Sequence, residues 1–146
     1  MVGDQQAVAE QADVGRDHAD AMRVVWHNHP KDSDVGALFA ESMMDLRPWD
    51  LWKLDGTTQP GTPEIMDTLK AVLKLDPMHP QGNHLWIHTM EASPHPEAAT
   101  PSADRLRTME PTIGHMVHMP SHIYVRTGRW RDSIKANALA IKTDND

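Results

Sequence analysis

Histidine is the residue type in this sequence with the widest capacity for chemistry. The chain has ten histidines and no cysteine. Six residues form two triads, spaced i, i+4, i+7 and i, i+3, i+7, so that each triad lies on one face if its segment is helical. The triads are His84, His88 and Glu91, followed by His115, His118 and His122. Because His118 and His122 follow His84 and His88 by 34 positions, the same imidazole pair occurs in two consecutive units.

Four functions remain open for these residues. In the first, His84, His88, His118 and His122 bind one metal ion, and Glu91 is a further ligand or a general base toward bound water. Imidazole and carboxylate ligands suit zinc, nickel, copper or iron. In the second, the histidines carry out acid–base chemistry or bind an anion without a metal. In the third they line a groove for a peptide, protein or small-molecule ligand, and in the fourth they only pack between helices.

The elements that must position these residues are expected to be helices. Alternating apolar and polar runs rich in Val, Ile and Thr, which mark strands, do not appear. Prolines and glycines delimit the apolar helical stripes. We expect Asp34 and Thr62 to be helix N-caps. The expected helices cover residues 7–26, 35–46, 63–75, 81–92, 97–109, 113–127 and 129–142.

Pro120 interrupts or kinks the helix expected over residues 113–127, because proline lacks a backbone N–H and clashes with the preceding turn. It falls between His118 and His122. A kink there either turns these two side chains apart or aims them at a shared point.

The helix pairs recur with a period of 34 residues, which separates Pro77 from Pro111. Several residues occupy characteristic repeat positions, namely Phe39, Ala40, Trp86, Ala99, Ser121, Tyr124 and Ala140. Over about residues 15–146 the chain therefore resembles the tetratricopeptide repeat family. It departs from that pattern at Ile87, Leu106 and Pro120. The resemblance implies an all-α, right-handed α-α superhelix of about three and a half helix hairpins. It also implies that the histidine triads line the concave groove, with Arg126 beside them as a clamp for a carboxylate or phosphate.

An insertion of about 13 residues, covering about residues 47–61, separates two of the expected hairpins. It contains Trp49 and Trp52, whose large apolar area is expected to leave water. They either pack the insertion onto the helices or form a flap over the groove entrance. We expect His18, His79 and His95 at the surface, because His18 and His79 have no partner at helical spacing and His95 lies between two prolines in a loop.

Composition limits the partners of the chain. Its 146 residues predict a single domain over 1–146, and a net charge of −7 argues against nucleic acid or an anionic membrane. Without a basic and apolar leader we expect a cytoplasmic protein. Ile134, Leu139 and Ile141 predict an apolar face on the last helix. We therefore expect either self-association through that face or a longer protein of which this chain is a fragment.

Overall fold

The computed structural model describes residues 2–145, with side chains from residue 13 onward. Every regular element in this part of the chain is helical, as the sequence predicts. The elements are α1 (Val2–Asn28), α2 (Ser33–Met44), α3 (Thr62–Leu75), α4 (Pro80–Glu91), the 3₁₀ helix η1 (Pro96–Ala99), α5 (Thr100–Met109), α6 (Gly114–His118), α7 (Pro120–Arg126) and α8 (Trp130–Asn145).

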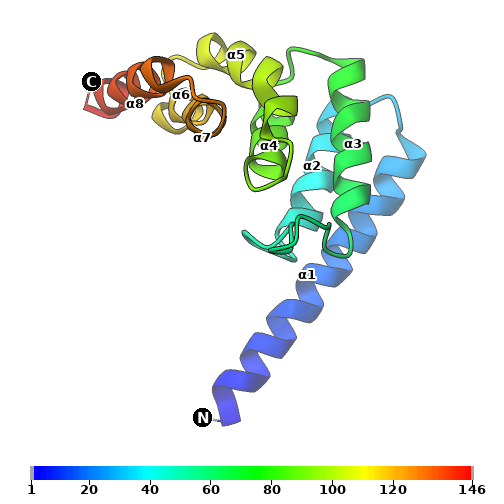
Figure 1. The fold of residues 1–146 in the computed structure, drawn as a ribbon. Coiled ribbons are helices and arrows are strands. Elements are labelled where there is room, and N and C mark those ends of the chain that lie inside the picture. The colour runs from blue at the N-terminus through cyan, green and yellow to red at the C-terminus, as the bar shows by residue number, and fades with distance from the viewer. Residues whose placement is uncertain (1, 146) are drawn as a thin grey trace.

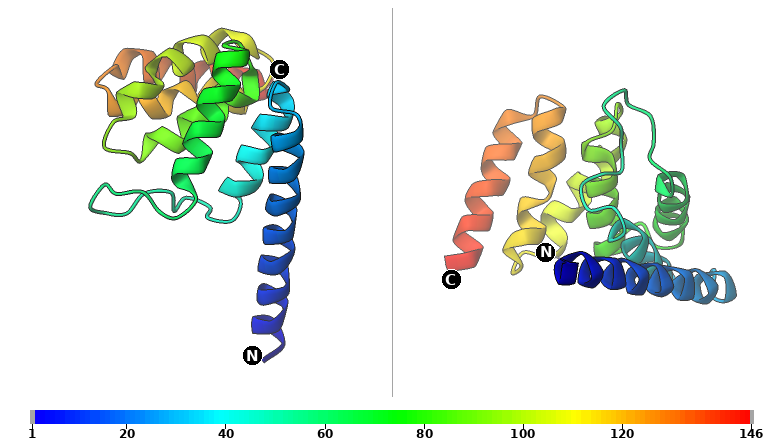
Figure 2. Two further views of the ribbon diagram at one scale, coloured as in Figure 1. Left: turned by 90° about the vertical axis from the view of Figure 1, so that its right-hand side faces the viewer. Right: turned by 90° about the horizontal axis from the view of Figure 1, so that it is seen from below.

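Helix α4 occupies the middle of the molecule. It contacts α3 and α5, its neighbours in the sequence, and also α2 and α7. Figure 1 shows α1–α3 on one side of α4 and α6–α8 on the other, and the right-hand view of Figure 2 shows the same order. The side chains of α4 are therefore held between the two halves of the chain.

Two expected N-caps are wrong. Asp32, not Asp34, caps α2, because its Oδ1 accepts hydrogen bonds from the backbone N–H groups of Asp34 and Val35 at 3.1 and 3.2 Å. Thr62 is the first residue of α3 rather than its cap, and the cap position belongs to Gly61, with φ 90°. The Thr62 hydroxyl instead donates to the carbonyl oxygen of Leu51 at 2.8 Å. It thereby ties the insertion to the start of α3.

His79 sets the beginning of α4, and the expectation that it lies at the surface is wrong. It is only 6% exposed. Its Nδ1 accepts from the backbone N–H of Gly82 at 3.0 Å, and its Nε2 lies 2.9 Å from Oδ1 of Asp34. A Cβ added at Gly82 would lie 2.9 Å from Cγ1 of Val72. The absence of a side chain at Gly82 therefore lets α4 approach α3 closely.

Prolines divide the C-terminal half more finely than the sequence suggests. The expected break at Pro120 is confirmed, since α6 ends at His118 and α7 begins at Pro120. The segment 97–109, expected as one helix, is divided into η1 and α5. Each of these elements has a proline at its first or second residue, and proline is well accommodated in a helix only in the first turn.

Tyr124 joins α7 to α5. Its buried hydroxyl donates to Oδ1 of Asp104 at 2.8 Å. Arg129 donates to the same oxygen at 2.8 Å, and its guanidinium lies 4.2 Å from the centre of the Tyr124 ring. These contacts fix α7, which carries His122, relative to the rest of the fold.

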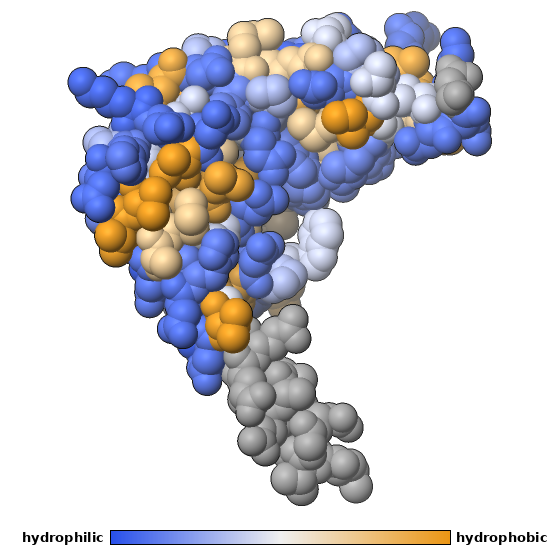
Figure 3. Space-filling view, turned by 180° about the vertical axis from the view of Figure 1, so that it is seen from behind, coloured by the Kyte–Doolittle hydropathy of each residue, from blue (hydrophilic) through white to orange (hydrophobic). Residues whose placement is uncertain are grey.

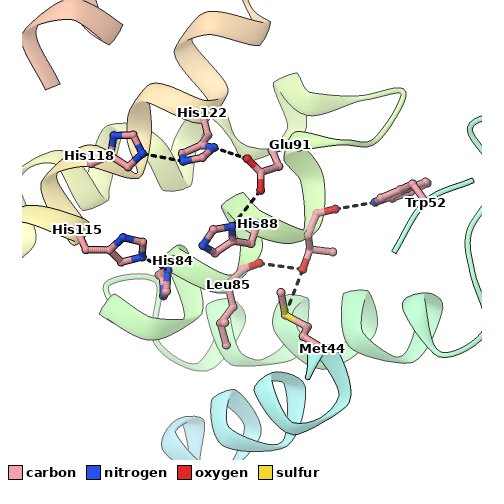
Figure 4. Close-up of polar contacts among 10 residues, drawn as sticks. Met44, Trp52, His84, Leu85, His88, Glu91, His115, His118 and His122 are labelled. Carbon is pink, nitrogen blue, oxygen red and sulfur yellow. Dashed lines mark hydrogen bonds and ion pairs between the residues drawn. The ribbon is translucent and has the colours of Figure 1, made fainter. Parts of the chain in front are cut away.

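The insertion packs on α4 through Trp52. The indole Nε1 of Trp52 donates to the carbonyl oxygen of Thr89 at 2.7 Å, as Figure 4 shows. Trp49 behaves differently, because it is 81% exposed and has a left-handed φ of 62°. Trp52 therefore packs the insertion onto the helices, as one of the two expectations has it, whereas Trp49 lies outside the core.

The face seen in Figure 3 is mostly hydrophilic, and apolar residues gather on it at the side that holds α1–α3. On α8, Ile134 and Ile141 are 68% and 64% exposed, which agrees with the apolar face expected there. What covers that face stays a prediction. Among the described residues no helix combines the length and apolar character that crossing a bilayer requires.

We predict that Tyr124→Phe lowers the free energy of unfolding by about 1–2 kcal/mol, because it removes a hydrogen bond to a charged acceptor. Urea unfolding followed by circular dichroism measures this. Thr108→Ala on α5 is the control, since its exposed hydroxyl bonds only to the carbonyl of Arg105 at 3.3 Å. Equal stabilities of the two variants would contradict the role given to Tyr124.

Candidate metal centre

Five imidazole rings from α4, α6 and α7 form a closed ring of side chains. Figure 4 shows them facing one another across the space between these helices. The centroids of neighbouring rings are 4.8 to 6.5 Å apart. In order around the ring, the residues are His84, His88, His122, His118 and His115. The structure thus brings together all five histidines of the two predicted triads.

Three of the five offer nitrogens close enough for one metal ion. One ring nitrogen from each of His84, His88 and His115 lies within 4.8 Å of the other two. The shortest of these separations joins the Nε2 atoms of His84 and His115, at 3.1 Å. The set differs from the expected ligands, because His115 joins His84 and His88 while His118 and His122 stand beside them as a separate pair.

A side-chain amide fixes the tautomer of His84. The Nε2 of Gln81 donates to Glu41 at 3.0 Å, so the Oε1 of Gln81 is the end that faces His84. That oxygen lies 3.1 Å from Nδ1 of His84 and can only accept. The proton of His84 therefore sits on Nδ1, and Nε2 presents a free lone pair to the ring.

Glu91 lies between His88 and His122. Its Oε1 is 3.0 Å from Nδ1 of His88, and its Oε2 pairs with Nδ1 of His122. Burial alone would raise the pKa of Glu91, but the hydrogen bonds from His122 and His88 outweigh it and lower the pKa to about 2. The ionised carboxylate therefore uses one oxygen to orient each imidazole. This is the usual position of a carboxylate behind a metal-binding histidine.

The electrostatics favour the neutral form of two of the imidazoles, those of His84 and His115. Burial, with added repulsion from His88, His115 and His122, lowers the pKa of His84 to about 4. Burial and the neighbouring histidines also lower the pKa of His115. Both residues therefore hold a lone pair at neutral pH, and a metal ligand must be deprotonated in this way.

A cavity of about 610 Å³ opens beside two of the three histidines, His84 and His88. His84 and His88 form one wall, and the insertion supplies Trp49 and Trp52. The rings of Trp49 and His88 meet edge to face with centroids 5.4 Å apart. Arg126, the remaining predicted site residue, is exposed and also lines this cavity. The cavity therefore reaches from the imidazoles to a guanidinium.

Two residues of the site were not found by sequence reasoning, namely Gln81 and Asn137, and His115 was expected in the groove but not among the metal ligands. Gln81 precedes His84 by three residues, and that spacing was a usable signal for a partner on the same helix face. Asn137 approaches His118 from α8, and no local spacing predicts that contact.

Comparison with known proteins identifies no relative of this chain. Searches of protein-family models, of curated proteins and of solved structures find no match for the chain. The functional argument therefore depends on the imidazole ring itself.

We predict that the metal-free protein loses stability as pH falls from 6.5 to about 4. In this range unfolded His84 takes up a proton that folded His84 excludes. The unfolded state therefore binds more protons and becomes more stable relative to the folded state. His84→Gln removes this contribution. Urea unfolding at several pH values is expected to show a steeper loss for the natural protein than for the variant. A His84 ring that titrates near 6.5 by NMR would contradict the prediction.

Proposed function

We propose that the protein binds a divalent transition-metal ion through His84, His88 and His115. The observation that carries the proposal is the convergence of three ring nitrogens within 4.8 Å. Metal–nitrogen distances of about 2.0–2.1 Å put two imidazole nitrogens on one ion roughly 2.8–3.4 Å apart. The 3.1 Å between His84 and His115 lies within that range.

The chemistry of the ligands selects the class of ion. Three neutral imidazoles suit zinc, nickel, copper or iron rather than calcium or magnesium, which prefer oxygen ligands. An ion with three protein ligands keeps a position for water or for another molecule. In this protein His84 and His88 border the cavity, so a molecule in the cavity lies next to that position. The bound ion would supply Lewis acidity to it.

The arrangement of the helices supports a tetratricopeptide-like superhelix as part of the same proposal. Each helix packs on its neighbour in the sequence, and α4 also packs on α2 and α7. Stacked helix hairpins make contacts of this kind. In such an array α4, α6 and α7 would present the imidazoles on the concave side.

We predict that the purified, untagged protein binds zinc at neutral pH and that His84→Ala and His115→Ala each weaken this binding about 100-fold or more. Titration calorimetry with zinc and elemental analysis after dialysis measure affinity and content. His95→Ala is the matched control, because His95 is exposed, stands outside the ring and contacts Glu97. Metal-free natural protein after incubation with zinc, nickel and copper would refute the proposal.

The cavity favours a second candidate function, a binding module that needs no metal. Its wall combines two indoles with Arg126, which suits a small ligand with an apolar body and a carboxylate. We predict that benzoate, a minimal probe of this class, shifts the indole NMR signal of Trp49 saturably in metal-free protein. Arg126→Gln is expected to weaken this binding and to leave the zinc content unchanged. Equal binding by the variant would count against this function.

A further inference from the structure

We infer that His118 and His122 hold a second metal ion, next to the first and joined to it by the Glu91 carboxylate. The inference deepens the proposed function and rests on it, because it makes the imidazole ring a two-ion centre. The observations behind the second position are nevertheless separate from those behind the first.

The second pair has the spacing of two ligands on one ion. The Nε2 atoms of His118 and His122 are 2.9 Å apart, within the range of roughly 2.8–3.4 Å that metal–nitrogen bonds impose. The two residues stand on opposite sides of the break at Pro120, on α6 and α7. Their ring planes meet at 77°, so the two Nε2 atoms approach without stacking of the rings.

An anchored amide fixes the tautomer of His118. The Nδ2 of Asn137 donates to the backbone carbonyl of Ser133 at 3.0 Å, so Oδ1 is the end that faces His118. This oxygen lies 2.6 Å from Nδ1 of His118 and accepts its proton. Nε2 of His118 is therefore the unprotonated nitrogen.

The carboxylate of Glu91 does the same for His122. It pairs with Nδ1 of His122 and has no proton of its own to donate. Nε2 of His122 is thereby turned toward Nε2 of His118. The gap of 2.9 Å between the two Nε2 atoms can hold either a shared proton or a metal ion, and a metal ion requires both nitrogens to be unprotonated. A metal ion satisfies both lone pairs at once.

The second position repeats the construction of the first. In the first, Gln81 holds Nδ1 of His84 with an amide that is itself anchored on Glu41. In the second, Asn137 holds Nδ1 of His118 with an amide anchored on Ser133. In both, an Nε2–Nε2 separation of 2.9–3.1 Å results. This shared design prepares Nε2 of His84 and His118 alike as metal ligands.

Glu91 couples the two positions. One of its oxygens orients His88, a ligand of the first ion, and the other orients His122, a ligand of the second. In Glu91→Gln only one end of the amide can accept, and its NH2 group opposes the remaining Nδ1–H. We therefore expect this variant to weaken at least one of the two ions about 10- to 100-fold.

The test counts zinc ions by calorimetry and elemental analysis on the full chain. The natural protein is expected to bind two equivalents, and His118→Ala and His84→Ala are each expected to retain one. Asn137→Ala keeps every ligand, so it is expected to retain two equivalents with the second weakened about 10- to 100-fold. His95→Ala is the control for nonspecific binding by a surface histidine. Circular dichroism checks the fold, and Asn137→Ala serves if His118→Ala does not fold.

The outcomes separate the two proposals. If the natural protein binds one equivalent of zinc, and this zinc is lost in His84→Ala but retained in His118→Ala, the second site is refuted and the proposed function stands. This result would mean that His118 and His122 share a proton. One equivalent that is lost in His118→Ala and unchanged in His84→Ala overturns the first site and retains an ion at His118 and His122. With copper(II) in place of zinc, spin–spin coupling in the electron paramagnetic resonance spectrum of the natural protein, absent in His118→Ala, supports adjacent ions.

Discussion

Hydrogen bonds behind the imidazoles determine what this site can do. An imidazole can expose either nitrogen as its lone pair, and the group that accepts from the other nitrogen makes the choice. Here the acceptors are side-chain oxygens of Gln81, Glu91 and Asn137, and each holds Nδ1. In the neutral rings of His84 and His118, Nε2 therefore points into the ring of side chains as a lone pair, and Nε2 of His122 faces that of His118. Without these oxygens the five histidines would be a polar cluster with no defined donor set.

The fold serves this arrangement by fixing three short segments from different parts of the chain. Helix α4 is capped by His79 and lies close to α3 at Gly82. Helix α7 is tied to α5 through Tyr124 and Asp104. Asn137 reaches the ring from α8, which contacts both α6 and α7. Misplacement of any of these helices would separate ring nitrogens that must lie about 3 Å apart on one ion.

The sequence predicted the helical class and the five histidines because both follow from local spacing. Periodic apolar residues and prolines define the helices, and positions four or seven apart share a helix face. The sequence did not predict how the histidines divide into a trio and a pair. That division depends on the angle between α6 and α7 at Pro120, which no local rule gives. The role of His79 was missed for a similar reason, since it depends on Asp34, 45 positions earlier.

The imidazoles and the space beside them come from different stretches of the chain. The ring belongs to α4, α6 and α7, whereas much of the cavity wall comes from the insertion, whose indole Trp49 has an 81% exposed surface. Loops of this kind tolerate changes in length and sequence far better than packed helices do. Changes in the insertion can therefore reshape the cavity wall without touching any of the five imidazoles.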